Sequence, residues 1–395
     1  MSIDKKRNGF AKAGILLIFI MFAATVAAQK PAAENTAAYI HLLKNMKIGL
    51  TANHTALADN KHLLDILLDK GVNVVKIYSP EHGFRGNAGE GETIAHSKDE
   101  KTGISIISLY GNNKKPTAKQ LEGLDCMVFD MQDVGTRFYT YLSTMHYIME
   151  ACAENGIRLI VLDRPNPNGF YIDGPVLKPE FRSFIGMHPI PAVHGMTLGE
   201  LALMINAEGW LDKGKDCNLT VIPCVDYTHR SRYRLPVPPS PNLPDMQAVY
   251  LYPTLCFFEG SPLSVGRGTD FPFTVIGHPD FKGKAGYEFS FVPRIKTGKI
   301  KPLFENQTCY GKDFRKSDTG NITEINLNLI IEIYNDWQRR SEFFKPVFSK
   351  LAGNSELQSQ IEAGESAETI RKSWQNDLDS FKVKRKKYLL YPDFY

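Results

Sequence analysis

Carboxylates and arginines recur directly after predicted β-strands in the first half of the chain. The carboxylates are Glu81, Glu92, Asp133 and Asp163. The arginines that accompany them are Arg85, Arg137 and Arg164. Gathering several such charges in one place is costly for stability alone, so we interpret them as functional groups. Two carboxyl groups with separated pKa values are the machinery of glycoside hydrolysis, in which one protonates the leaving oxygen and the other attacks or activates water.

Short β-rich runs alternate with helical stretches, and this order would place the charged groups at one edge of a sheet. We expect strands at 47–51, 73–78, 104–109, 126–130, 158–163 and 218–223, and helices at 61–70, 141–155 and 197–208. This alternation predicts an α/β fold: a Rossmann-like, mostly parallel sheet with helices on both faces. Ligands bind such sheets outside the carboxyl ends of the strands. The loops at those ends, including Asn53 after the first strand, are therefore expected to line one polar cleft.

Each of these loop residues also has a structural explanation. An Asp at a strand end can cap the next helix, and Gly and Pro in the loops can serve turn geometry alone. Four aromatic residues near the loops are candidates to stack on sugar faces, with core packing as the alternative: Phe84, Phe138, Tyr139 and Tyr141.

Other chemistries have weaker support in the sequence. No GxGxxG follows the first strand and no GxxxxGK[ST] occurs, so a nucleotide cofactor is disfavoured and none is expected. No GxSxG nucleophile motif occurs either. A metal site would have to be assembled from scattered residues, namely His54, His82, Asp130 and Asp133. Because the usual ligand spacings are absent, we rank a metal-dependent hydrolase below carboxylate catalysis and expect no metal.

The second half of the chain has a different pattern. The proline-dense stretch 234–244 must run extended, and a Gly- and Pro-rich stretch follows at 259–279. We therefore predict a catalytic N-terminal domain at 29–250 and a smaller α+β domain at 251–395. The latter is expected to mix short strands with helical segments at 326–340 and 367–381.

Residues 1–28 combine a basic start, an apolar run and a small-residue end, which is typical of a Sec signal peptide. We therefore expect a periplasmic or secreted protein without integral membrane association after cleavage. This segment holds four basic residues and one acidic residue, so the net charge falls from +4 to +1 when it is removed. That balance gives no indication of nucleic-acid binding. The six cysteines show no zinc-ligand spacing; a disulfide between Cys217 and Cys224 and buried free thiols are both open.

At the same loops the sequence resembles a known family. Eight motifs occur in order: SPEHGFRG (79–86), GEGE (89–92), FDMQDVGTRFYTY (129–141), LDRPNPNG (162–169), DGP (173–175), HGMTLGE (194–200), PSPNLP (239–244) and FFEGSPLSVGRGTDFPFTVIG (257–277). Together they resemble the exo-β-N-acetylmuramidases of the NamZ type, over roughly residues 40–395. The resemblance implies a cleft between two domains that removes terminal, non-reducing N-acetylmuramic acid (MurNAc) from peptidoglycan-derived glycans without a nucleotide.

The resemblance also implies roles for individual residues. The resemblance points to Glu92 and Glu81 as catalytic carboxylates, and Asp133 is added from its position after a predicted strand. Candidates to bind the lactyl carboxylate of MurNAc are Arg85, Arg137, Arg164 and Arg267, because a guanidinium fork matches a carboxylate. Glu259, Asp270 and His194 are expected substrate contacts from the same resemblance. Asn53, His82 and Asp163 are expected substrate contacts from their positions in the strand-end loops. A non-catalytic cell-wall glycan-binding protein is the alternative from another class. The choice between retaining, inverting and acetamido-assisted hydrolysis is open at this stage.

Overall fold

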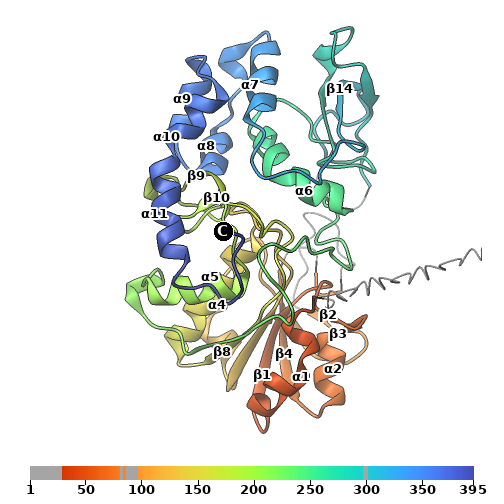
Figure 1. Cartoon of the computed structure of the whole chain (residues 1–395). Coiled ribbons are helices and arrows are strands. Elements are labelled where there is room, and N and C mark those ends of the chain that lie inside the picture. The colour runs from red at the N-terminus through yellow and green to blue at the C-terminus, as the bar shows by residue number, and fades with distance from the viewer. Residues whose placement is uncertain (1–28, 81–82, 86–96, 297–300) are drawn as a thin grey trace, which may run out of the picture.

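A seven-stranded sheet organises the first half of the chain in the computed structural model (Figure 1), which describes residues 29–80, 83–85, 97–296 and 301–395. The predicted signal peptide, Glu81, His82 and Glu92 lie outside the described residues. The strands, in their order across the sheet, are β11 (Leu219–Ile222), β8 (Arg158–Leu162), β7 (Cys126–Asp130), β1 (Lys47–Ala52), β4 (Asn73–Ser79), β6 (Ser105–Ser108) and β5 (Ser97–Lys98).

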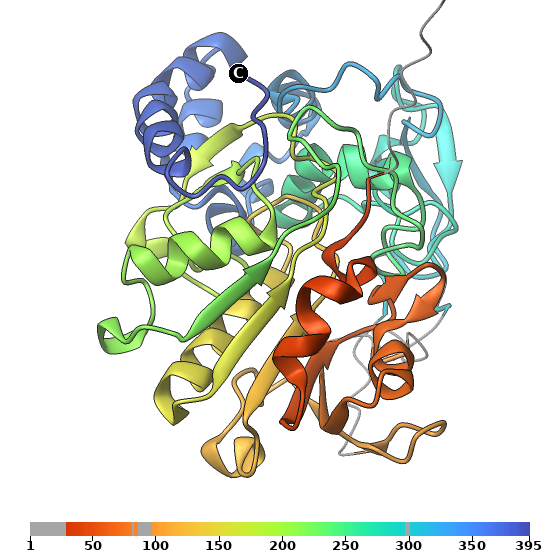
Figure 2. The ribbon, with the colours of Figure 1, turned by 60° about the horizontal axis from the view of Figure 1, so that its bottom comes forward.

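Six of these strands are parallel, and only the edge strand β5 runs antiparallel to its neighbour β6. Numbered along the chain, the parallel strands lie in the order 3-2-1-4-5-6, as in doubly wound Rossmann-like folds. The order reverses between β1 and β7. Loops leaving the two strands diverge there, which opens a crevice at the carboxyl edge of the sheet. Figure 2 shows the strands side by side below the C-terminal helices.

Alternating side chains of the strands belong to two separate hydrophobic cores, one on each face of the sheet. Met127 and Phe129 of β7 pack with α4 (Tyr141–Asn155) and α5 (Leu198–Ala207). Cys126 and Val128 pack with α1 (Thr36–Tyr39) and α2 (Leu63–Asp69). Figure 1 shows these helix pairs on opposite sides of the sheet. Strands buried on both faces read as continuous apolar runs, and the α/β fold predicted from those runs is confirmed.

Local signals in the sequence placed the elements well in this half of the chain. The helix predicted at 141–155 is α4, residue for residue, and it ends at Gly156 with φ +66°. Helix α5 begins as predicted, because Thr197 accepts the Glu200 amide while the Glu200 side chain accepts the Thr197 amide. A short helix, α3 (Ala118–Leu121), precedes β7. A hairpin of β9 (Asp173–Val176) and β10 (Pro191–Val193) follows β8.

The second half holds a three-stranded antiparallel sheet and a group of helices. The sheet has the order β12 (Val275–His278), β14 (Cys309–Asp313) and β13 (Phe289–Phe291). The helices are α6 (Met246–Leu255), α7 (Leu327–Asp336), α8 (Pro346–Ala352), α9 (Glu356–Glu362), α10 (Ala367–Ser373) and α11 (Gln375–Arg385). Helices α8–α11 lie beside β9 and β10, above the carboxyl edge of the large sheet (Figure 1).

Sequence reasoning was wrong about helix continuity in this half. The segment 367–381 forms two helices, because the buried Trp374 leaves the helical conformation between them. Helix α7 ends at Asp336 rather than near 340, since Trp337 is extended and buried. The domain division at residue 250 stays a prediction; that residue lies within α6, whose N-cap is Asp245. All six cysteines are buried and none is bonded to another.

Candidate active site

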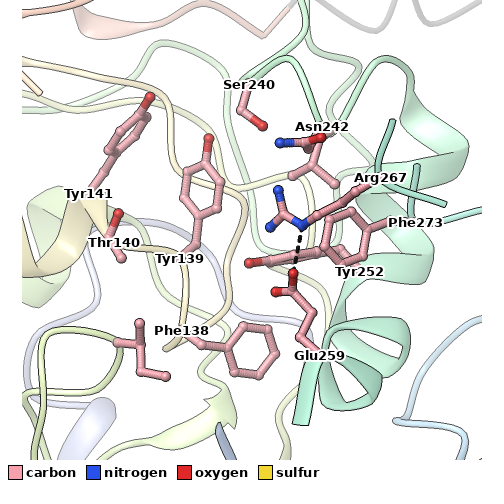
Figure 3. Close-up of a pocket in the computed structure, with 12 residues that line it drawn as sticks. Phe138, Tyr139, Thr140, Tyr141, Ser240, Asn242, Tyr252, Glu259, Arg267 and Phe273 are labelled. Atoms are coloured by element: carbon pink, nitrogen blue, oxygen red, sulfur yellow. Dashed lines mark hydrogen bonds and ion pairs between the residues drawn. The ribbon is translucent and has the colours of Figure 1, made fainter. Parts of the chain in front are cut away.

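A polar cavity of about 180 Å³ lies between the loop that precedes α4 and the segment from α6 to Phe273. It is lined by Phe138, Tyr139, Thr140, Tyr141, Ile185, Ser240, Asn242, Leu243, Tyr252, Glu259, Arg267 and Phe273. Residues from both halves of the chain therefore face one space (Figure 3). The buried Asn53, directly after β1, donates to the Tyr141 hydroxyl at 2.7 Å. This bond places the cavity, hereafter the pocket, next to the switch point of the sheet.

Glu259 and Arg267 are the charged residues among those that line the pocket. Glu259 stands in the 3-10 helix Cys256–Gly260 that continues α6, and Arg267 follows in the Gly-rich turn. The Arg267 Nε donates to Glu259 Oε1 at 2.6 Å (Figure 3). Their side chains are 31% and 29% exposed, so a ligand in the pocket has access to both. The pair offers a guanidinium for an anionic group and a carboxylate for hydroxyl donors.

Aromatic rings form much of the wall. Tyr139 packs edge-to-face against both Tyr141 and Tyr252, and Tyr252 packs in the same way against Phe273. The Tyr139 hydroxyl donates to the Pro239 carbonyl at 3.0 Å, which ties the wall to the proline-rich segment 234–244. Sugar rings present apolar faces and polar edges, and a wall of phenols and phenyl rings suits both. The fourth aromatic candidate, Phe84, instead packs against His62 in the core.

Asp133, on the loop that precedes α4, is buried close to His194. Its Oδ2 accepts the Gly135 amide at 2.7 Å and is 3.9 Å from His194 Nε2. Burial raises the pKa of Asp133 to about 7 and lowers the pKa of His194 to about 3. Both side chains are buried, and neither is among the residues that line the pocket.

Two other predicted site residues belong to a polar network inside the domain. Arg164 donates to both oxygens of Asp130, with Nη2 to Oδ2 at 2.9 Å, and both side chains are buried. Asp163 accepts bonds from Thr197 Oγ1 and Tyr391 Oη, each at 2.6 Å. Burial raises the pKa of Asp163 to about 6. These contacts join β8 to the N-terminus of α5 and to the end of the chain, and they leave neither residue facing the pocket.

The Arg137 guanidinium is also committed inside the protein. Nη1 donates to the carbonyls of Pro175 and Ile190, and Nη2 donates to those of Leu351 and Ala352, at 2.7–2.8 Å. Burial lowers the pKa of this guanidinium to about 9. Arg137 therefore joins the β9–β10 hairpin to α8 and is not accessible to a ligand. From its place in a strand-end loop, Arg137 was expected to face the cleft. The structure differs because sequence alone does not give the direction of a side chain.

The remaining predicted residues lie elsewhere. Arg85 forms a bidentate pair with Asp99, with Nε to Oδ1 at 2.6 Å, and is not among the residues that line the pocket. Asp270 is 87% exposed and pairs with Lys296. Of the thirteen predicted site residues, Glu259 and Arg267 thus line the pocket and Asn53 supports it. Glu81, His82 and Glu92 lie outside the described residues.

Sequence reasoning did not assign site roles to several lining residues. Ser240 and Asn242 belong to the motif PSPNLP, which marked the family but not the site. Tyr252 lies within α6, where a domain boundary was expected. For Ser240 and Asn242, the available signal was that family motifs occur in both halves of the chain, which suggests a site built from both.

No metal-binding cluster of three or more His, Cys, Asp or Glu side chains occurs among the described residues. Of the four residues considered for a metal, His54 bonds the Pro238 carbonyl and Asp130 is paired with Arg164. In the same part of the chain, no helix is both long and apolar enough to cross a membrane.

Comparison with known proteins decides the family. A model described as exo-β-N-acetylmuramidase NamZ, N-terminal, matches residues 48–247, and its C-terminal counterpart matches residues 250–391. The chain belongs to the NamZ family. The resemblance drawn from eight sequence motifs is therefore confirmed, and with it the assignment to the glycoside hydrolases.

Relatives of this NamZ-family chain are similar over most of their length. It is 40% identical over 371 residues to the peptidoglycan β-N-acetylmuramidase NamZ of Bacillus subtilis strain 168, which covers 89% of each chain. A DUF1343-family crystal structure from Bacteroides fragilis NCTC 9343 has 47% identity and a TM-score of 0.86, and covers 93% of this chain and all of that one. A second from the same strain has 29% identity and a TM-score of 0.78, over 92% and 99% of the two chains.

Proposed function

We propose that this protein is an exo-acting β-N-acetylmuramidase that removes terminal, non-reducing MurNAc from peptidoglycan-derived glycans. The observation that carries this proposal is the pocket itself. It joins a carboxylate–guanidinium pair to aromatic walls at the switch point of the sheet, in a chain 40% identical to a peptidoglycan β-N-acetylmuramidase. The matching family models are described as exo-β-N-acetylmuramidase, which favours exo action.

In this proposal Arg267 binds the lactyl carboxylate of MurNAc, the group that distinguishes this sugar from N-acetylglucosamine. A carboxylate ligand would share the guanidinium with Glu259, which already accepts from Arg267 Nε. Tyr139, Tyr252 and Phe273 would contact the ring, and Ser240 and Asn242 its polar edge. All of these residues except Tyr252 come from motifs that also mark the family.

The proposed acid and base are Glu92 and Glu81, with support from the sequence motifs alone. Both follow β4, the neighbour of β1 in the sheet, and β1 ends at the switch point. One carboxyl group would protonate the glycosidic oxygen, and the other would attack the anomeric carbon or orient the nucleophile. We propose no direct role in bond cleavage for Asp133, because it is buried and is not among the residues that line the pocket.

The test is hydrolysis of a chromogenic β-MurNAc glycoside by the purified protein, compared with the matching β-GlcNAc glycoside. We expect turnover of the first and little of the second. Glycans with MurNAc at the non-reducing end should release free MurNAc, whereas those ending in GlcNAc should not. Binding without release would instead support a glycan-binding protein, and loss of activity with EDTA a metal-dependent hydrolase.

Export is part of the same proposal, because the substrate is located outside the cytoplasm. The support is the composition of residues 1–28, with its basic start and apolar run. N-terminal sequencing of protein from the natural host should begin near Gln29. A mature protein that still begins at Met1 would contradict export by signal cleavage.

A further inference from the structure

The loop from Asp133 to Tyr141 connects β7 to α4 and carries the first wall of the pocket. It rests on β10: Thr136 pairs with Val193, and the Arg137 amide donates to the Ala192 carbonyl at 2.9 Å. Gly135 has φ +82°, and a Cβ at this position would lie 2.2 Å from Asn166 Oδ1. The loop therefore has one tightly packed path, and the groups that hold its start also set where its aromatic residues lie.

Asp133 and His194 are two of those groups, and their hydrogen bonds define where their protons lie. His194 Nδ1 accepts the Met196 amide at 3.2 Å, so the neutral ring carries its proton on Nε2. That nitrogen faces Asp133 Oδ2 at 3.9 Å, and Oδ2 also accepts the Gly135 amide. Asp133 Oδ1 and His194 Nε2 are buried without a hydrogen-bond partner in the described part of the chain.

The surroundings of the pair contain little that would stabilise a charge on Asp133. No Lys or Arg forms an ion pair with this carboxyl group among the described residues. Tyr139, on the same loop, is close enough for the charge of Asp133 to raise its pKa further. Besides Asp133, the charged or titratable groups near His194 include Arg137, His188, His229 and Arg385, and Arg385 is paired with Asp393. An ionised Asp133 would therefore be a buried carboxylate without a cation, which is costly.

We propose that Asp133 and His194 form a neutral buried pair that positions the pocket loop, with the proton of Asp133 on Oδ1 and that of His194 on Nε2. Oδ2 then remains the acceptor for Gly135 and faces the His194 donor. Ionisation of Asp133 displaces the loop and with it Tyr139 and Tyr141. Asp133 is thus a positioning residue for the reaction, and its effect on activity rests on the proposed function.

The first test is the pH profile of Asp133→Asn, because the amide imitates the protonated acid. The pKa of about 7 means that roughly a tenth of Asp133 holds its proton at about pH 8. We expect kcat/KM of the variant on the β-MurNAc glycoside, relative to the wild type, to rise about tenfold between pH 6 and pH 8. Asp125→Asn is the matched control. The exposed Asp125 carboxylate accepts the Lys47 backbone amide at the amino edge of the sheet, far from the pocket loop. The kcat/KM of this variant relative to the wild type should not change with pH.

The second test does not depend on activity. A raised pKa in the folded state means that the native protein binds the Asp133 proton more tightly, so this contribution to stability is lost as pH rises toward and through 7. The wild type should lose stability between pH 5 and pH 8 relative to Asp133→Asn, as measured by urea unfolding. His194 is present in both proteins, so its opposite trend cancels in the comparison.

Two outcomes would overturn the proposal that Asp133 and His194 form a neutral pair. One is an Asp133→Asn protein that is folded but inactive at every pH, since that would make the ionised carboxylate essential. The other is a wild type and variant with the same pH dependence of stability. If the wild type hydrolyses no muramide, the proposed function fails. The urea unfolding data still show whether Asp133 is protonated in the native protein. Asp133→Ala provides no acceptor for the Gly135 amide and no polar group opposite His194. This variant is expected to lose activity across the whole pH range.

Discussion

Asn53 and Tyr141 are joined by a hydrogen bond of 2.7 Å between the side-chain amide and the phenol, across the switch point of the sheet. Asn53 follows β1, and Tyr141 is the first residue of α4. Asn53 is buried and also accepts bonds from the amide and hydroxyl of Thr55. One side chain thus organises the end of β1 and holds the aromatic wall of the pocket against it.

Removing the Tyr141 hydroxyl should therefore destabilise the protein. Tyr141→Phe leaves the Asn53 donor buried, which costs about 1–3 kcal/mol in the free energy of unfolding. Urea denaturation measures this change. Tyr147→Phe on the same helix is the control, because its ring stacks on Phe184 and its hydroxyl makes no hydrogen bond to another described residue. Equal stability of the two variants would show that the Asn53 bond contributes nothing.

Arg267 should determine the preference for MurNAc over GlcNAc. Arg267→Ala removes the charged donor for the lactyl group, and such a bond contributes about 1.5–3 kcal/mol, or roughly ten- to a hundredfold in kcat/KM. The loss should fall on the β-MurNAc glycoside and spare any residual turnover of the β-GlcNAc glycoside. Arg315→Ala is the control, since Arg315 pairs with Asp313 and lies outside the pocket lining. An unchanged selectivity ratio would remove Arg267 from sugar recognition.

Glu92 should be essential for turnover but not for folding. Glu92→Gln keeps the shape of the side chain and removes its acid–base function, which contributes about 10²–10⁴-fold to the rate. We expect that loss in kcat on the β-MurNAc glycoside, with an unchanged urea midpoint. Glu90→Gln, two residues away in the same motif, is the matched control. Near-wild-type activity of Glu92→Gln would reject the catalytic assignment.

Arg137 should be needed for stability rather than for recognition. Its four bonds to carbonyls use the planar geometry of a guanidinium, which a lysine ammonium cannot reproduce. Arg137→Lys is expected to lower the free energy of unfolding by about 2–3 kcal/mol, with the ratio of MurNAc to GlcNAc turnover unchanged. A stable variant with altered selectivity would restore Arg137 to the sugar site.

The family and the layout of the large sheet were both accessible before the structure. Apolar runs of strand length, helical stretches between them and the capping box at Thr197 are local signals, and they located β1, β4, β7, β8, α4 and α5. Helix ends in the second half were harder to predict. Trp337 and Trp374 interrupt helices there because burying an indole outweighs the small gain from another helical turn.

Prediction of the site was limited by side-chain direction. Arg137, Arg164 and Arg267 have the same chemistry and all follow glycine- or aspartate-rich motifs, yet only Arg267 lines the pocket. The other two are turned inward by acceptors from distant parts of the chain: Leu351 and Ala352 for Arg137, and Asp130 for Arg164. Such long-range acceptors have no local signature.

The sequence by itself determined the family, the alternation of strands and helices, and the edge of the sheet where chemistry is expected, because each depends on local pattern or residue type. Only the tertiary structure decided which polar side chains reach the pocket or solvent and which form hydrogen bonds inside the protein. That choice depends on hydrogen bonds such as Asp163 with Tyr391, between residues far apart in the chain, and on the cost of leaving a buried polar group without a partner.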